Sequence, residues 1–287
     1  MSDAAIVTDL AQNGIPVRTS CHILQLPAST YYRQCRIDLP QQVKPVADDA
    51  LLIERIKDQK LRKPAWGSRR IRLFLRRKFG YQINRKRVHR ILRDLGLLVE
   101  RPVHRAKRTP QRHKPRPTSH NEWWGTDMTK FYVDAVGWVY LVIVLDWYTC
   151  KIIGYSLGLR PNTDLWIRAL DMAVQVACPA GSRSYGLHLM SDNGSQPTSG
   201  KYENHLKDLW IEHATTSYCN PKGNADTERM FRTIKEDYIW LNDFTSFDEA
   251  LAVLTAGIEE YNVDYPHSAL DGMSPNEFEQ ICIAKAA

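Results

Sequence analysis

The chain has 287 residues, 43% of them hydrophobic, so it is long enough for two or three domains with proper cores. Its most apolar run, Val139 to Leu145, is far too short to cross a bilayer, and its N-terminal stretch lacks the basic segment of a signal peptide. The six cysteines are scattered without a CxxC pair, which argues against a zinc site or a disulfide framework and favours a reduced, cytoplasmic setting.

The net charge of +7 conceals a strong asymmetry along the chain. Residues 67–119 hold 18 Lys and Arg against 2 Asp and Glu, whereas residues 120–287 hold 12 against 23. A segment with a net charge of +16 repels itself unless a polyanion lies against it. This charge favours nucleic acid as the partner over a merely solvated surface.

Short helical stretches separated by glycine and proline occupy residues 3–36. Their spacing predicts an N-terminal helix-turn-helix domain over residues 1–45, with Thr30, Tyr31 and Arg33 on its recognition helix. A plain helical hairpin has the same spacing, so both interpretations stay open at this point.

A second helical domain is predicted over residues 46–99, because apolar residues recur at helical spacing and Asn84 is a favourable N-cap. The outward faces of its last two helices are rich in arginine, whose guanidinium group binds phosphates and guanine edges. The residues expected to contact DNA from these helices are Arg69, Arg70, Arg76, Arg77, Lys86, Arg87 and Arg90.

Residues 100–119 contain four prolines and seven Lys or Arg, with few apolar side chains. Such a segment cannot form a core, and its prolines keep it extended. We expect a basic interdomain linker that follows a phosphate backbone through Arg105, Lys107 and Arg108, with a passive linker as the alternative.

From residue 120 onward the pattern changes to β-branched and aromatic strands alternating with helices. The predicted strands cover residues 123–133, 137–149, 151–158, 185–191 and 213–218, and the predicted helices cover 164–177, 199–209 and 223–240. This βββαβαβα order predicts an α/β domain over residues 120–287, with one mixed five-stranded sheet and flanking helices. Trp123 and Trp124 are expected in its core, with stacking on DNA ends as the alternative.

Three carboxylates stand at places where they can converge. Asp127 lies within the first strand, Asp192 lies at a strand end before Asn-Gly, and Glu228 lies in the first turns of the long helix. Each has an ordinary explanation as a turn or helix-dipole residue. Together they would repel one another without a cation, and a site with oxygen ligands alone favours two Mg²⁺ or Mn²⁺ ions that flank a scissile phosphate.

Between Asp192 and Glu228 lie 35 residues, and Lys235 follows Glu228 by seven. With the stretches GTDMTKF, SDNGSQ and NADTERMFRTIKED, this pattern resembles the DDE catalytic core of retroviral-type integrases and related transposases. More narrowly, it resembles the second-reading-frame product of a large class of bacterial insertion sequences. The sequences WGSRR at residues 66–70 and YNVDYPHSALDGMSPNEF near the C-terminus extend the similarity over most of the chain.

The resemblance implies a ribonuclease-H-like fold with Asp127, Asp192 and Glu228 as the catalytic, metal-binding triad. It also implies that Lys235 contacts substrate DNA, and helical geometry places Lys235 and, nearly, Arg232 on the same face as Glu228. The implied partners are the element's terminal inverted repeats, target DNA, further copies of the chain in a synaptic complex, and the element's first-frame protein. No membrane partner is expected.

Two other functions share parts of this pattern. A transposase-derived regulator would bind DNA without cutting it, although such a copy would be free to lose its carboxylates. A ribonuclease H or repair nuclease would share the fold, but such enzymes rarely need so much basic helical apparatus.

Overall fold

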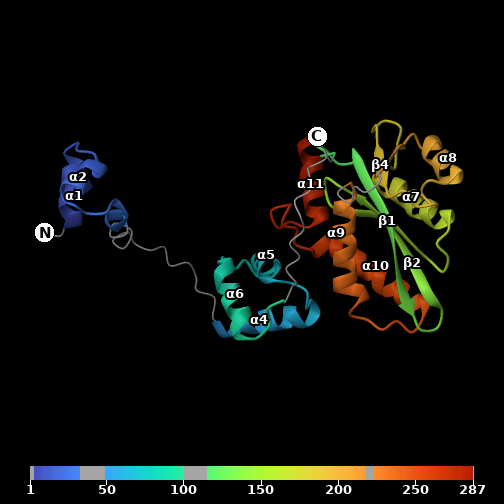
Figure 1. Ribbon diagram of the computed structural model, residues 1–287, viewed down its shortest axis with the longest axis horizontal. Helices are drawn as coiled ribbons and strands as arrows, with labels where there is room; N and C mark the ends of the chain where they lie inside the picture. The colour runs from blue at the N-terminus through green and yellow to red at the C-terminus, as the bar shows by residue number, and fades with distance from the viewer. Residues whose placement is uncertain (1–2, 33–48, 100–114, 217–222, 287) are drawn as a thin grey trace. The chain divides into compact units, whose positions relative to one another are not determined.

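The computed structural model describes residues 3–32, 49–99, 115–216 and 223–286, in two compact units that meet in the sequence at residues 51 and 52 (Figure 1). The first unit contains α1 (Asp3–Gln12), α2 (Val17–Ile23) and a helical segment at 28–32. Val7, Cys21 and Tyr31 form its small core. Tyr31, which we expected on the recognition helix, is therefore a core residue, and Arg33 lies outside the described residues.

A three-helix module opens the second unit, with α4 (Asp49–Arg62), α5 (Ser68–Phe79) and α6 (Arg85–Asp94). Asn84 caps α6 as predicted, since its side-chain oxygen accepts a hydrogen bond from the Lys86 amide at 2.9 Å. The buried stripes of α5 and α6 belong to one apolar cluster with those of α4. Leu61, near the end of α4, lies outside this cluster and is 82% exposed.

The remainder of the second unit is built on one five-stranded sheet in the order β3-β2-β1-β4-β5. Its strands are β1 (Trp123–Val133), β2 (Gly137–Asp146), β3 (Ile152–Gly158), β4 (His188–Ser191) and β5 (Glu212–Thr215). The first three strands are antiparallel neighbours, whereas β4 runs parallel to both β1 and β5. The mixed sheet and the βββαβαβα order are confirmed.

Helices cover both faces of this sheet (Figure 1). On one face, α7 (Thr163–Ala177) and α8 (Gly200–Asp208) share a core cluster with Trp124, Val142 and Val144. On the other, α9 (Ala225–Ile234), the single π-helical turn η1 (Lys235–Ile239) and α10 (Phe247–Asp264) pack on the opposite side chains of β1 and β2. Trp124 is fully buried, as predicted for a core strand aromatic.

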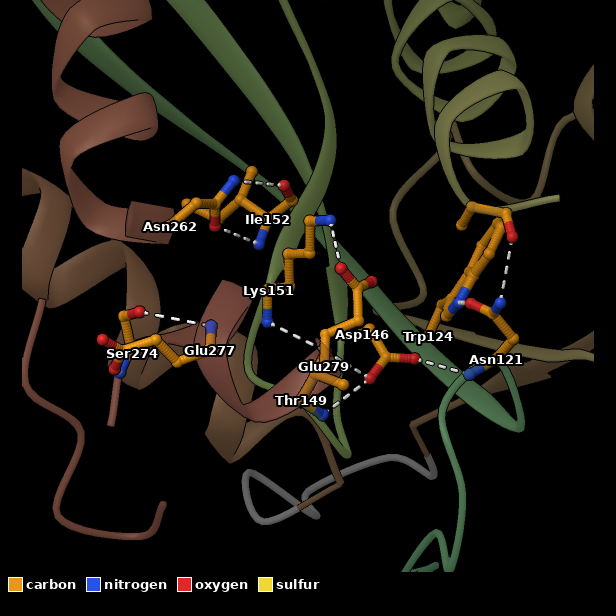
Figure 2. Close-up of polar contacts among 11 residues, drawn as sticks. Asn121, Trp124, Asp146, Thr149, Lys151, Ile152, Asn262, Ser274, Glu277 and Glu279 are labelled. Carbon is orange, nitrogen blue, oxygen red and sulfur yellow. Dashed lines mark hydrogen bonds and ion pairs between the residues drawn. The ribbon is translucent and has the colours of Figure 1, made fainter. Parts of the chain in front are cut away.

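The C-terminal helices fasten the edge strand β3 (Figure 2). The Asn262 side chain on α10 accepts a hydrogen bond from Ile152 N at 3.0 Å and donates one to Ile152 O at 2.8 Å. Lys151 forms an ion pair of 2.6 Å with Glu279 on α11 (Pro275–Ala286). Asn262 thus satisfies backbone groups that an edge strand otherwise leaves unpaired. None of the described helices is long and apolar enough to span a membrane.

The three-helix module contacts α10 and α11 directly. Lys63, which is almost fully buried, lies 3.0 Å from the Glu260 carboxylate. Arg77 donates hydrogen bonds to the carbonyl oxygens of Val263 and Asp264 at the end of α10, and pairs with Glu277 at 3.0 Å. Arg77 therefore satisfies carbonyl groups at a helix C-terminus.

Candidate active site

Asp127 lies in the middle of β1, opposite Ile143 of β2, and its side chain is half-buried. It points to the same face of the sheet as Gly125, since side chains alternate along a strand. That face carries α9. Because Asp127 lies within β1 and points to this face, its carboxylate is located between the sheet and α9.

Asp192 directly follows β4, the strand parallel to β1. The last paired residues are Gly125 and Met190, so continuing the register by two residues brings Asp192 beside Asp127. The Asp192 side chain is exposed, and its Oδ1 accepts a hydrogen bond from Gly194 N at 3.2 Å. The Asn-Gly turn after the strand thus holds this carboxylate at the carboxyl end of β4.

Helix α9 approaches β1 unusually closely. A Cβ on Gly125 would lie 2.2 Å from both Thr227 Oγ1 and Trp147 Nε1, so only glycine fits there. Trp147 donates a hydrogen bond to Thr227 at 3.1 Å, and Asn224 donates one from its amide to the Thr126 carbonyl at 3.0 Å. These contacts fix the start of α9 and with it Glu228, which follows Thr227.

An open cavity of about 250 Å³ lies between β1 and this helix. Its lining consists of Asp127, Met128, Thr129, Glu228, Phe231, Arg232, Lys235 and Trp240. A larger cavity of about 660 Å³ lies along β3, α7 and α10, but none of the expected catalytic residues line it. We therefore place the candidate chemistry in the smaller cavity.

The electrostatics of the cavity centre on Asp127. The pKa of Asp127 is raised to about 6, mainly by burial and in smaller part by the nearby carboxylates of Asp192 and Glu228. A hydrogen bond of 2.7 Å from Met128 N and the positive charge of Lys235 act in the opposite direction. Asp192, Glu228 and Lys235 thus all lie within electrostatic range of Asp127.

The carboxylates are close without being gathered around a common point. In the part of the chain that the structure describes, no three His, Cys, Asp or Glu side chains lie close enough together to share one metal ion. Asp192 and Glu228 are both exposed, and Asp192 is not part of the cavity lining. Of the three carboxylates, Asp127 and Glu228 therefore share this cavity.

Lys235 and Arg232 both line the cavity, as the helical spacing predicts. The helix becomes irregular after α9. The turn Lys235–Ile239 is π-helical, and Trp240 N donates a hydrogen bond to Lys235 O at 2.8 Å. A π-turn inserted into an α-helix is common at functional sites. Nothing in the local sequence pattern indicated it.

A network of hydrogen-bonded side chains lies next to Asp192. Ser191 Oγ lies 2.8 Å from His213 Nε2 on β5, and His213 Nδ1 lies 2.5 Å from a Glu203 oxygen on α8. Ser191 also donates a hydrogen bond to the Asp192 carbonyl at 2.8 Å. Our sequence analysis missed this hydrogen-bond network because its members are polar residues from three separate elements.

The basic residues expected to bind DNA fall into three groups. Arg69, Arg76, Lys86 and Arg90 are exposed on the module, and Arg87 is half-buried. Arg70 and Arg77 are partly buried and face the rest of the second unit, where the Arg70 guanidinium lies 5.1 Å from the Tyr265 ring centre. Arg105, Lys107 and Arg108 lie outside the described residues.

Family models match both parts of the second unit. Residues 47–106 match an HTH-like domain, and residues 117–221 and 209–275 match two models of an integrase core domain. A helical DNA-binding module followed by an integrase core defines the class of polynucleotidyl transferases that cut and join DNA strands.

The relatives give the family within that class. The chain is 31% identical over 266 residues to the InsK protein of insertion sequence element IS150 from Escherichia coli (strain K12), covering 88% of this chain and 90% of InsK. It is 29% identical over 283 residues to the transposase InsF of insertion sequence IS3A from the same strain, covering 92% and 93%. The chain belongs to this family of insertion-sequence transposases.

The fold agrees with this assignment. The structure of a simian T-cell lymphotropic virus intasome aligns with a TM-score of 0.50 at 17% identity, covering 78% of this chain and 74% of the viral chain. At that identity the likeness concerns the fold alone. It confirms the predicted ribonuclease-H-like architecture, and the HTH-like match at residues 47–106 agrees with a helical region before it in the sequence.

Proposed function

We propose that Asp127, Asp192 and Glu228 are the catalytic carboxylates with which this transposase cuts and joins DNA at the ends of its insertion sequence. The observation that supports the proposal is their proximity: Asp127 on β1 and Glu228 on α9 line one cavity, and Asp192, at the end of the parallel strand β4, lies close enough to raise the pKa of Asp127. The Gly125 to Thr227 contact, which only glycine permits, serves to hold Glu228 at that edge.

The side chains of this edge fit a site for divalent cations. Their donors are carboxylate oxygens without His or Cys, which suits Mg²⁺ or Mn²⁺, and we propose two ions per site. The raised pKa of Asp127 means that its ionised form is costly while no cation is near. When bound, the cations would supply charge neutralisation at the scissile phosphate and activation of the attacking oxygen.

The reaction needs no nucleophile from the protein. A water oxygen attacks the phosphorus at the element's end, and the 3′ oxygen leaves with a proton as a free hydroxyl. That hydroxyl then attacks a phosphorus of target DNA in line, and a target 3′ oxygen leaves. The contribution of the chain is to hold the strand end in position, with Lys235 and Arg232 on the phosphates beside the cut.

Recognition of the element's ends belongs to the helical parts of the chain. We propose that Arg69, Arg76, Lys86, Arg87 and Arg90 contact DNA from the module, because four of them are exposed and one is half-buried. The basic linker with Arg105, Lys107 and Arg108, and the N-terminal unit with Arg33, would extend this contact. Arg70 and Arg77 instead hold the module against the core.

Strand joining requires two element ends at once, so we expect several copies of the chain in one complex with both terminal repeats and target DNA. The first-frame protein of the element would be a further partner. Gel filtration and light scattering of the chain, with and without terminal-repeat DNA and with the first-frame protein, would test the assembly.

The function itself is tested by incubating the full chain with a labelled terminal repeat, target plasmid and Mg²⁺. The transposase function predicts joined products, whereas a regulator predicts binding without cutting and a ribonuclease H predicts cutting of RNA–DNA hybrids. Lys235→Ala should weaken end binding with little change in melting temperature. A large fall in melting temperature with unchanged binding would make Lys235 a structural residue.

A further inference from the structure

Trp240 is a large aromatic residue left in water beside the carboxylates. It follows η1 directly, and its backbone N–H closes the π-turn by donating to Lys235 O at 2.8 Å. Its side chain is 66% exposed, although it lines the same cavity as Asp127 and Glu228. The backbone is therefore held in place while the indole projects at the edge of the candidate active site.

Two other exposed tryptophans of the chain differ from Trp240. The Trp138 ring has the Lys130 ammonium 4.5 Å from its centre, and the Trp210 ring has the Arg183 guanidinium at 5.0 Å. Within the described residues, no ring or cation lies against the Trp240 indole. The indole face that a cation occupies at Trp138 and Trp210 is thus available for binding at Trp240.

The residues around the free face of the Trp240 indole indicate which class of ligand would bind there. Lys235 and Arg232 offer positive charge for a phosphate, and the indole offers a flat apolar face for a planar ring. A nucleotide unit is the ligand that carries both a phosphate and a planar ring. Base stacking on an aromatic side chain tolerates any sequence, because every base has a π-face.

We propose that Trp240 is a base-stacking residue, against which the nucleobase next to the scissile phosphate lies after it leaves the DNA stack. Unpairing a base costs a few kcal/mol, and stacking on an aromatic ring offsets part of that cost. The displaced base frees the phosphate to move toward Asp127 and Glu228. This inference rests on the proposed function, since it assumes that the DNA end enters this cavity.

The direct test is photo-crosslinking of the full chain to its terminal repeat. A duplex with 5-iodouracil at one of the three positions next to the cut is bound without divalent metal and irradiated, and the crosslinked peptide is identified by mass spectrometry. We expect the crosslink at Trp240 from one of these positions. Trp240→Ala should lose it while retaining the DNA complex.

Kinetics provide the second test. Cleavage by Trp240→Ala should fall roughly ten-fold or more, whereas Trp240→Phe keeps a ring and should retain most of the rate. A mismatch that leaves the base next to the cut unpaired should restore part of the Trp240→Ala rate. Trp210→Ala is the matched control, because it removes an indole that is 62% exposed but lies outside the cavity lining.

The outcomes separate this inference from the proposed function. If Asp127→Asn abolishes cleavage but Trp240→Ala cuts normally and no crosslink reaches Trp240, the stacking role is wrong and the active site stands. If Asp127→Asn still cuts DNA, the active-site assignment itself fails. Asp127→Asn should keep the Trp240 crosslink, because that substitution leaves Lys235, Arg232 and Trp240 in the cavity lining unchanged.

Discussion

The indole N–H of Trp66 donates a hydrogen bond of 2.8 Å to Asp237 Oδ2, across 171 residues of sequence. Trp66 stands between α4 and α5 of the DNA-binding module, and Asp237 is a buried residue of η1, the turn that begins with Lys235. Beside it, the Lys63 ammonium lies 3.7 Å from the centre of the Tyr238 ring. The module therefore contacts the same turn that contributes Lys235 to the cavity and precedes Trp240, so DNA binding by the module would act on the candidate active site.

Trp66→Phe tests this link, because it keeps a ring but removes the only donor of that hydrogen bond. Asp237 Oδ1 has no hydrogen-bond partner among the described residues, and burial raises the pKa of Asp237. Without the Trp66 hydrogen bond, the charges of Lys63 and Arg70 would remain to offset the burial of the carboxylate. We expect a loss of about 1–3 kcal/mol in the free energy of unfolding, measured by urea denaturation. Cleavage should fall more than DNA binding does.

A double mutant provides the control for that prediction. Asp237→Asn removes the buried charge, so Trp66→Phe should cost less in the Asp237→Asn background than in the wild-type chain. Equal losses of stability in both backgrounds would mean that the hydrogen bond contributes nothing, and that Trp66 acts through packing alone.

Arg76 and Arg77 are sequence neighbours on α5 for which we expect opposite effects. Arg77→Ala should cost about 1–3 kcal/mol of stability, because Arg77 binds two carbonyl oxygens of α10 and the Glu277 carboxylate. Arg76 is exposed, so Arg76→Ala should leave the melting temperature unchanged. It should also make the slope of the logarithm of the DNA-binding constant against the logarithm of the salt concentration shallower by about one unit. Calorimetry and binding titrations at several salt concentrations compare the two. The same effect from both substitutions would contradict the assignment.

The contrast between these two arginines shows where sequence reasoning succeeds and where it ends. The strands and helices could be predicted because alternation and helical spacing are local. Asp127, Asp192 and Glu228 could be proposed from their places within a strand, at a strand end and at a helix start, together with the family resemblance. Arg76 and Arg77 have the same local pattern, and only α10 and α11, nearly 190 residues later, distinguish them. The contact between Gly125 and Thr227 and the π-turn at Lys235 likewise depend on tertiary packing.

Gly125→Ala should displace the start of α9. The new methyl group would lie 2.2 Å from Thr227 Oγ1 and Trp147 Nε1, so helix and strand must move apart. We expect a loss of about 1–3 kcal/mol in stability and a larger proportional loss of cleavage, because Glu228 moves with the helix. Gly200→Ala is the control, since nothing lies within 4 Å of its added Cβ, and it should be neutral or stabilising. Normal cleavage by Gly125→Ala would mean that this contact does not position Glu228.

Acid should destabilise the protein partly through His267. The pKa of His267 is lowered to about 3, mainly by burial and in smaller part by the positive charges of Arg70 and Arg229. Below pH 6.5 the unfolded chain takes up a proton on this residue that the folded chain does not, so stability falls as the pH drops toward 3. Between pH 7 and pH 4.5 this contributes about 1–3 kcal/mol, and His267→Phe should reduce the loss. Melting temperatures at both pH values measure it; parallel pH dependences of wild type and variant would exclude this role.

Asp127→Asn, Asp192→Asn and Glu228→Gln remove one negative charge each with little change in shape. Each variant alone should abolish cleavage and joining, because each removes a ligand that the divalent cations require. Folding and end binding should persist, and in the absence of metal they should strengthen, since the repulsion that raises the pKa of Asp127 is relieved. Activity should require Mg²⁺ or Mn²⁺, and Ca²⁺ should support binding without chemistry. The measurement is a cleavage and joining assay run beside a binding assay on the same samples.

Asp226→Asn is the matched control, because Asp226 also lies in the first turn of α9 but lines a different cavity, and it should remain active. Any triad variant that joins DNA at a near-normal rate identifies a residue that is not a catalytic ligand. If wild-type protein binds element ends but never cuts them in the presence of its metal and partner, the chain is a regulator.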